Sequence, residues 1–284
     1  FAASSLDRIF QDGHTLLKPN FSTSVSLSAA KNEYESFQIV VQTGQQAIEK
    51  TSITLNDFIN IENNLTLDKS NFSVRKVGYI PSSKPYYKVK YVGNWPDPLL
   101  PFQSTSIAPQ STQPFWVTVY IPTTTVSGSY KGSINVKTDG FETNIPILLT
   151  VYNFDLPKQN HLKTAFDFYG YLTKQQYPQG EKEENSAYTE RISAINDKYI
   201  LSMLDYRMNP VLNIDPSSQE DLGRIDRYLV RGLNNFAIGK KGGTFDNNWP
   251  KSDEEIEKLL PIYQAYGENL KLNRMLEYTY IYTW

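Results

Sequence analysis

An alternation with a period of two restricts the fold of the first half of the chain. In segment 115–121, Phe, Val, Val and Ile alternate with Trp, Thr and Tyr, and four aliphatic residues repeat the pattern in segment 145–151. This period is typical of a β-strand that buries one face. The runs Glu35–Thr43 and Tyr130–Thr138 are also rich in β-branched and aromatic residues, and the Asp-Gly pair at 139–140 predicts a hairpin. We therefore expect an antiparallel β-sandwich.

The pattern changes after residue 160, where strand-like and helical stretches alternate. A helix is expected over Ser186–Arg207, because apolar residues recur there at three- and four-residue spacing; they are Tyr188, Ile192, Ile195, Tyr199 and Met203. Further helices are expected over Ser218–Leu233, with a capping box from Ser217 to Glu220, and after Ser252. The expected strands are Leu162–Tyr171, Pro210–Ile214, Phe236–Gly239 and Met275–Trp284. Strands that alternate with helices predict a parallel α/β architecture.

The fold class predicted is therefore multidomain, β plus α/β. A TIM-type (β/α)₈ barrel needs roughly 250 residues, so the remaining stretch holds about four βα units, the first half of such a barrel. We expect residues 1–157 to form an immunoglobulin-like β-sandwich and residues 158–284 a partial barrel that is incomplete at its carboxyl end. Its open edge would be covered by a further segment or by self-association with another copy.

Composition excludes several classes of chemistry. The chain has no cysteine and only two histidines, which argues against thiol catalysis, zinc fingers, iron–sulfur clusters and histidine-rich metal sites. We expect no metal and no cofactor. The net charge of -2 argues against nucleic acid as a partner, and no apolar run reaches the roughly 20 residues of a membrane-spanning helix. The first residue is Phe1, which would fit a processed protein, so a secreted or cell-surface location is expected.

Several segments together carry a resemblance to a known family. They are Lys31–Val41, Gly93–Pro101 with its Trp-Pro-Asp-Pro-Leu-Leu-Pro run, Gln113–Val119, Gly128–Gly132, Tyr152–Pro157 and Leu204–Pro210. In these segments the chain resembles glycoside hydrolase family 123 and the related uncharacterised proteins grouped as DUF4091. The resemblance extends over nearly the whole chain, and the Trp-Pro-Asp-Pro-Leu-Leu-Pro run is its most specific part.

The resemblance implies a β-sandwich followed by a (β/α)₈ barrel that removes β-linked N-acetylgalactosamine from a glycan. The implied mechanism is retaining and substrate-assisted: the acetamido oxygen of the substrate attacks the anomeric carbon, an Asp orients that group, and the neighbouring Glu protonates the departing oxygen. In the family this Asp-Glu pair follows the fourth barrel strand, which corresponds here to Tyr278–Trp284. The pair is therefore expected just after Trp284, no catalytic residue is assigned, and residues 1–284 alone are expected to be inactive.

Substrate-contacting residues remain to be identified. Barrel enzymes place their sites at the carboxyl ends of the strands, and a carboxylate beside aromatic rings can bind sugar hydroxyls and stack on a sugar face. The candidates at or near the strand ends are Asp167, Tyr169, Arg207, Asn209, Asp215, Tyr282 and Trp284. For three of them a structural role is the alternative: Asp167 inside a barrel layer, Asp215 at a helix start, and Trp284 as a layer-filling aromatic.

Two features outside the barrel have competing interpretations. Trp95 lies in a Pro-rich stretch that is expected to be a loop, and it would serve either as a carbohydrate platform or as a packing residue that fixes the angle between the domains. The acidic run Glu181–Glu184 is interpreted as a solvated loop. For the whole protein, the alternatives to a glycosidase are a non-catalytic carbohydrate-binding or structural protein, and a soluble domain without a ligand.

Overall fold

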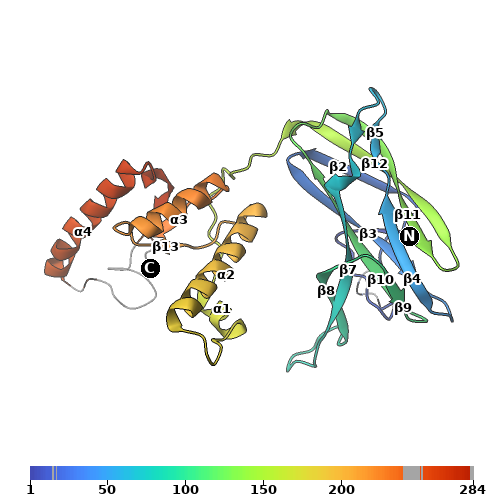
Figure 1. The fold of residues 1–284 in the computed structure, drawn as a ribbon, viewed down its shortest axis with the longest axis horizontal. Helices are drawn as coiled ribbons and strands as arrows, with labels where there is room; N and C mark the ends of the chain where they lie inside the picture. The colour runs from blue at the N-terminus through green and yellow to red at the C-terminus, as the bar shows by residue number, and fades with distance from the viewer. Residues whose placement is uncertain (15, 17, 239–249, 251, 282–284) are drawn as a thin grey trace. The chain divides into compact units, whose positions relative to one another are not determined.

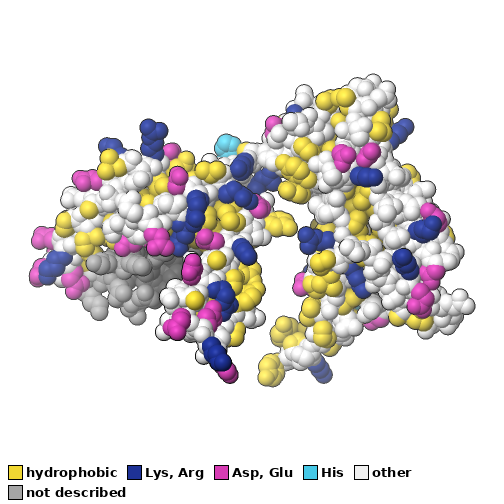
Figure 2. Space-filling view, viewed as in Figure 1, with side chains coloured by type: hydrophobic (Ala, Val, Ile, Leu, Met, Phe, Trp, Pro, Cys, Tyr) yellow, Lys and Arg dark blue, Asp and Glu magenta, His cyan; other side chains and the backbone are white. Residues whose placement is uncertain are grey.

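The computed structural model describes residues 1–14, 16, 18–238, 250 and 252–281. The chain divides into two compact units, Phe1–Leu156 and Pro157–Trp284 (Figure 1). Lys and Arg side chains are interspersed with Asp and Glu over the visible face of each unit (Figure 2), in agreement with the formal net charge of -2. No helix among the described residues has the length and apolar character required to cross a lipid bilayer.

Two β-sheets build the first unit. One sheet has five strands in the order β1-β3-β10-β7-β8, all paired antiparallel. Its strands are β1 (Ala2–Ser4), β3 (Glu33–Gln42), β10 (Thr112–Ile121), β7 (Phe72–Pro81) and β8 (Asn94–Pro101). The 3₁₀ turn η1 (Lys69–Asn71) precedes β7.

The other sheet follows the order β2-β12-β11-β4-β9, and the short strands β5 and β6 attach to it through β11. The bounds are β2 (Val25–Lys31), β12 (Glu142–Asp155), β11 (Gly128–Thr138), β4 (Ile48–Leu55), β9 (Thr105–Ile107), β5 (Phe58–Asn60) and β6 (Thr66–Leu67). One expectation needs correction, because β2 pairs with β12 in parallel. The unit is therefore a sandwich with both antiparallel and parallel strand pairs. The turns between successive strands predict hairpins, but they do not indicate how β2 pairs with a strand far along the chain.

The two sheets share one hydrophobic core. Apolar side chains from both sheets belong to a single cluster that includes Ile39, Phe115, Val117, Ile134 and Leu149. The predicted alternation is confirmed: residues 115, 117, 119 and 121 of β10 are buried, as are residues 145, 147, 149 and 151 of β12. Burying a side chain of this kind contributes about 1.5–3 kcal/mol, so these two strands specify the inner faces of the sandwich.

The predicted hairpin at Asp139-Gly140 joins β11 to β12, where Thr138 N–H donates to the Phe141 carbonyl at 2.7 Å. The Asp139 carboxylate also accepts from the backbone N–H groups of Glu49 and Lys50 in β4, at 3.0 and 3.1 Å. These bonds hold the pKa of Asp139 below its ordinary value. The turn therefore closes one hairpin and also fixes the end of the neighbouring strand.

A short parallel sheet lies at the centre of the second unit, in the order β13-β14-β15. Helices separate its strands along the chain: α2 (Asn185–Asp205), β13 (Asn213–Ile214), α3 (Gln219–Val230), β14 (Phe236–Ile238), α4 (Asp253–Leu272), the 3₁₀ turn η2 (Leu276–Tyr278) and β15 (Thr279–Tyr280). A second cluster of buried apolar residues joins these elements, among them Ile200, Leu204, Ile225, Phe236 and Leu270. The predicted alternation of strands and helices is thus present.

The strand predicted over Leu162–Tyr171 is mostly wrong. Phe166 forms a single parallel bridge with Pro210, and helix α1 (Gly170–Gln176) begins before the predicted strand ends. Aromatic residues such as those in this run favour β-strands, but a strand also needs a neighbouring strand to pair with along its length. Here only Phe166 has one: its N–H donates to the Asn209 carbonyl, and its carbonyl accepts from the Val211 N–H, both at 2.8 Å.

Serine side chains begin the two later helices. Ser252 accepts from the Glu255 N–H at 3.3 Å and starts α4 as predicted. In α3 the cap is Ser218, which accepts from the Asp221 N–H at 3.2 Å. The cap predicted at Ser217 is therefore one residue too early, and the helix begins at Gln219 rather than at Ser218. A serine cap satisfies one of the N–H groups that a helix start leaves unpaired, and is typically worth about 1 kcal/mol.

Candidate functional site

Two of the predicted site residues directly follow strand positions at the carboxyl edge of the parallel sheet. Asp167 follows the bridge residue Phe166, and Asp215 follows β13. Because parallel strands end at the same edge, loops that leave this edge converge there, and this edge is where α/β folds place ligands. It is the candidate functional site of the second unit.

Asp167 and Tyr169 form a hydrogen-bonded pair at this edge. The Tyr169 hydroxyl donates to Asp167 Oδ2 at 2.9 Å, and this bond, with the charge of Asp167, raises the pKa of Tyr169 above its ordinary value. Tyr171 stands beside it with ring centroids 5.7 Å apart, and both tyrosines are more than half exposed, at 52% and 60%. The group offers one carboxylate acceptor and two accessible aromatic faces, which is the chemistry that a sugar requires.

Asp215 makes hydrogen bonds with residues of the turn that leads into α3. Its Oδ1 accepts from Ser217 Oγ at 2.6 Å and from the Ser217 N–H at 3.0 Å, while its own N–H donates to Asp221 at 2.9 Å. Burial raises the pKa of Tyr266, and so do the charge of Asp215 and a hydrogen bond to it. These contacts give Asp215 a structural role at the turn that enters α3.

Arg207 and Asn209 lie at the opposite edge, because they precede the strand positions 210–214. Arg207 Nε donates to the Pro157 carbonyl at 3.2 Å, and its backbone has a positive φ of 57°. Asn209 is buried, and its Oδ1 accepts from the Asn234 N–H at 2.8 Å. The side-chain contacts described for these two residues thus lie at the amino edge, although the Asn209 carbonyl accepts from the N–H of Phe166, the residue before Asp167.

A buried asparagine network at this amino edge escaped the sequence analysis. Asn234 Nδ2 donates to the carbonyls of Asn160 and Leu162, at 2.7 and 3.0 Å, and Asn235 Nδ2 donates to the Thr164 carbonyl at 2.8 Å. The network joins the segments that precede three successive strand positions, so it fixes where each one begins. The Asn-Asn pair immediately before an apolar strand was its only sequence signal.

The other two candidates, Tyr282 and Trp284, lie outside the described residues. Within the described part of the chain, no group of three or more His, Asp or Glu side chains is arranged to hold a metal ion.

Trp95 belongs to a strand, which corrects the expectation of a loop. The Pro-rich stretch forms β8 and pairs with β7, where Ile80 lies opposite Trp95. The Trp95 ring meets Phe10 edge-on at 5.3 Å, and the Arg8 guanidinium lies over it at 5.4 Å. Proline is tolerated here because β8 is an edge strand and needs N–H donors on one side only. These ring contacts come from the first unit and give Trp95 a packing role within it.

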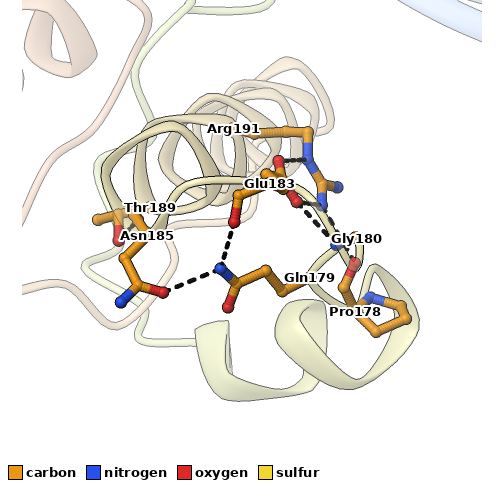
Figure 3. Close-up of polar contacts among 7 residues, drawn as sticks. All are labelled: Pro178, Gln179, Gly180, Glu183, Asn185, Thr189 and Arg191. Atoms are coloured by element: carbon orange, nitrogen blue, oxygen red, sulfur yellow. Dashed lines mark hydrogen bonds and ion pairs between the residues drawn. The ribbon is translucent and has the colours of Figure 1, made fainter.

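The acidic run at 181–184 lies in an exposed turn, as expected, except that Glu183 is partly buried and forms an ion pair. Arg191 of α2 contacts both Glu183 carboxylate oxygens, and Glu183 Oε2 also accepts from the Gly180 N–H at 3.0 Å (Figure 3). Gln179 Nε2 donates to the Glu183 carbonyl at 2.7 Å and to Asn185 Oδ1 at 2.9 Å. The cluster holds the turn that leads into α2, so its carboxylate has a structural function.

Comparison with known proteins relates this chain to one family of enzymes. The glycoside hydrolase 123 N-terminal domain matches residues 4–138. A family 123 glycoside hydrolase from Clostridium perfringens, whose structure addresses glycolipid glycan hydrolysis, superposes on 99% of this chain with a TM-score of 0.70 and 16% sequence identity. This chain spans 57% of the length of that protein.

Two other solved structures share less. The CupB2 chaperone of Pseudomonas aeruginosa is 8% identical and has a TM-score of 0.27, with 46% of this chain and 53% of that chain covered. The CooA pilin subunit of enterotoxigenic Escherichia coli is 13% identical and has a TM-score of 0.26, with 53% and 98% covered. Neither similarity is high enough to indicate a function for this chain. No curated protein matches the sequence. The predicted resemblance is nevertheless confirmed: this chain resembles glycoside hydrolase family 123, and residues 4–138 match the N-terminal domain of that family.

Proposed function

We propose that this chain is the amino-terminal part of a retaining glycoside hydrolase that acts on a β-linked amino-sugar glycan outside the cell. The observation that carries the proposal is the superposition of 99% of the chain on a family 123 hydrolase. That protein's association with glycolipid glycans supports a carbohydrate substrate here. The β-linked N-acetylgalactosamine comes from the family resemblance.

The proposal includes the architecture of a longer protein. The first unit would be an immunoglobulin-like sandwich, and the second unit would be the first half of a TIM-type barrel. The parallel order β13-β14-β15 and the parallel bridge between Phe166 and Pro210 support this assignment. Phe166 is 44% exposed, as expected for a barrel residue whose remaining neighbours come from elsewhere, either a further segment or a second copy.

At the carboxyl edge we assign Asp167 and Tyr169 to substrate contact. The Asp167 carboxylate would accept a hydrogen bond from a sugar hydroxyl, and the exposed Tyr169 ring would lie against an apolar sugar face. Under the family mechanism, the acetamido oxygen of the substrate is the nucleophile, and an Asp-Glu pair beyond Trp284 supplies the orienting group and the acid. These edge residues would position the sugar, and residues 1–284 alone would not hydrolyse it.

The test is an assay of the complete protein with p-nitrophenyl β-N-acetylgalactosaminide. Asp167→Asn should lower kcat/KM by roughly 10- to 150-fold, the equivalent of about 1.5–3 kcal/mol for a lost hydrogen bond to a charged group. Asp226→Asn, which alters an exposed carboxylate of α3, is the matched control and should leave kcat/KM unchanged. The activity proposal is wrong if the complete protein turns over no β-hexosaminide; sugar binding without turnover would then support the non-catalytic alternative.

A further inference from the structure

A long loop joins β7 to β8 and extends away from the body of the first unit (Figure 1). It covers residues 82–93, between Pro81 and Asn94. Ser82 and Gly93 close its base: Ser82 N–H and Oγ both donate to the Gly93 carbonyl, at 2.8 and 3.0 Å, and the Gly93 N–H lies 3.1 Å from Ser82 Oγ. Two residues are enough to connect the strands of a hairpin, so the connection over residues 82–93 is longer than the turn requires. Long loops of this kind are commonly functional.

The loop exposes aromatic and cationic side chains together. Tyr86 and Tyr87 are 111% and 73% exposed, and the surrounding lysines Lys84, Lys88 and Lys90 are exposed as well. Hydrophobic side chains and a cationic one are visible at the tip in Figure 2. No Asp or Glu occurs between residues 81 and 97. The tip is therefore positive and aromatic on a chain whose net charge is -2.

The base of the loop is anchored firmly. Tyr91 stacks on His14 at 4.3 Å and meets Phe10 edge-on at 4.6 Å, and its hydroxyl donates to Asp12 at 3.1 Å. The aromatic residues of one loop thus divide into two groups: Tyr91 packs against the sandwich, while Tyr86 and Tyr87 face outward. An anchored base keeps the exposed tip in a defined place.

We propose that the tip of this loop docks the protein onto an anionic lipid surface. Tyrosine is favoured at the level of lipid headgroups, where its ring and hydroxyl meet apolar and polar surroundings. Lysines close to an anionic leaflet add electrostatic attraction. The arrangement suits surface contact without insertion. The inference deepens the proposed function, because glycolipid glycans are presented on membranes and an enzyme that acts on them works at that surface.

The experiment measures binding of the purified chain to vesicles that contain no glycolipid. Vesicles of phosphatidylcholine and phosphatidylserine in equal parts are compared with phosphatidylcholine alone. We expect binding to the anionic vesicles only, weakening with added salt. The triple variant K84E/K88E/K90E should weaken binding by at least about 100-fold, as expected from three lysines. The double variant Y86S/Y87S should weaken it at unchanged charge.

A matched control separates the loop from overall charge. The variant K18E/K50E/K131E changes three exposed lysines of the same unit and produces the same change in net charge; it should retain most of the binding. The proposal would be overturned if both triple variants lost vesicle binding equally. It would also be overturned if the parent chain bound neutral and anionic vesicles equally, or bound neither. Self-association abolished by Y86S/Y87S would also overturn it and identify a second copy as the partner.

The two proposals can fail separately. Vesicle binding requires no sugar, and cleavage of the soluble nitrophenyl substrate requires no membrane. Loop variants of the complete protein should therefore cleave the soluble substrate at the unaltered rate. Circular dichroism of each variant should match that of the parent chain, because every changed side chain is exposed.

Discussion

Arg191 donates a hydrogen bond to each carboxylate oxygen of Glu183: Nε lies 2.7 Å from Oε1, and Nη2 lies 2.8 Å from Oε2 (Figure 3). The hydrogen bonds from Arg191, followed by that from the Gly180 N–H, lower the pKa of Glu183 from 4.5 to about 2. A lowered pKa stabilises the folded state above the unfolded value of 4.5, and this contribution is lost as pH falls through about 2. Carbon-detected NMR titration of Glu183 should show this midpoint.

Arg191→Met should raise the Glu183 midpoint toward 4.5, the ordinary value. The matched control is Lys258→Met, which removes the cation of the exposed Glu254–Lys258 pair in α4 and should leave Glu183 unchanged. A Glu183 midpoint near the ordinary value in the parent chain would contradict the bidentate geometry.

Neighbouring leucines of β12 test the inner and outer faces of the sandwich. Leu149 is fully buried in the shared core, whereas Leu148 is 40% exposed on the other face. Leu149→Ala should lower the free energy of unfolding of the first unit by about 2–5 kcal/mol, because it leaves a cavity. Leu148→Ala should cost less than about 1 kcal/mol. Chemical denaturation followed through the amides of β12 measures both, and equal losses would contradict the assigned faces.

The asparagine network should be important for stability of the second unit. Asn234→Ala removes the buried amide that donates to the carbonyls of Asn160 and Leu162, and the loss of these two hydrogen bonds should cost about 1–3 kcal/mol. Asn273→Ala, at the exposed end of α4, is the control and should have a smaller effect. Thermal unfolding of the two variants would decide the matter, and an unaffected melting temperature in Asn234→Ala would argue against the network.

The pair at the carboxyl edge has its own spectroscopic signature. Asp167→Asn removes the negative charge that, with its hydrogen bond, raises the pKa of Tyr169. The pKa of Tyr169 should therefore fall toward 10.0, its ordinary value. A titration of the tyrosine ring carbons by NMR gives the readout. Asp226→Asn should leave Tyr169 unmoved, and an unchanged midpoint in Asp167→Asn would mean that the two side chains do not meet.

The sequence predicted the sandwich core well and the second unit less evenly. In β10 the burial of Phe115 and Val117 follows from the period of two, because a strand in a two-layered fold has one inner face. In α2 the buried residues are Ile192, Ile200 and Leu204, and of the five residues noted by spacing only Ile192 is among them. A helix rich in apolar residues has more than one apolar face, and its packing in the tertiary structure decides which face is buried.

Chain order and side-chain periodicity by themselves determined the inner faces of β10 and β12 and the alternation of strands and helices after residue 160, while particular sequence segments carried the family resemblance. The parallel pairing of β2 with β12, the single bridge at Phe166, and the structural contacts of Asn209 with Asn234 were decided only by the tertiary structure. The physical reason is the range of the interactions: periodicity reports which face of an element is apolar, whereas pairing and edge position depend on hydrogen bonds between segments far apart in the sequence.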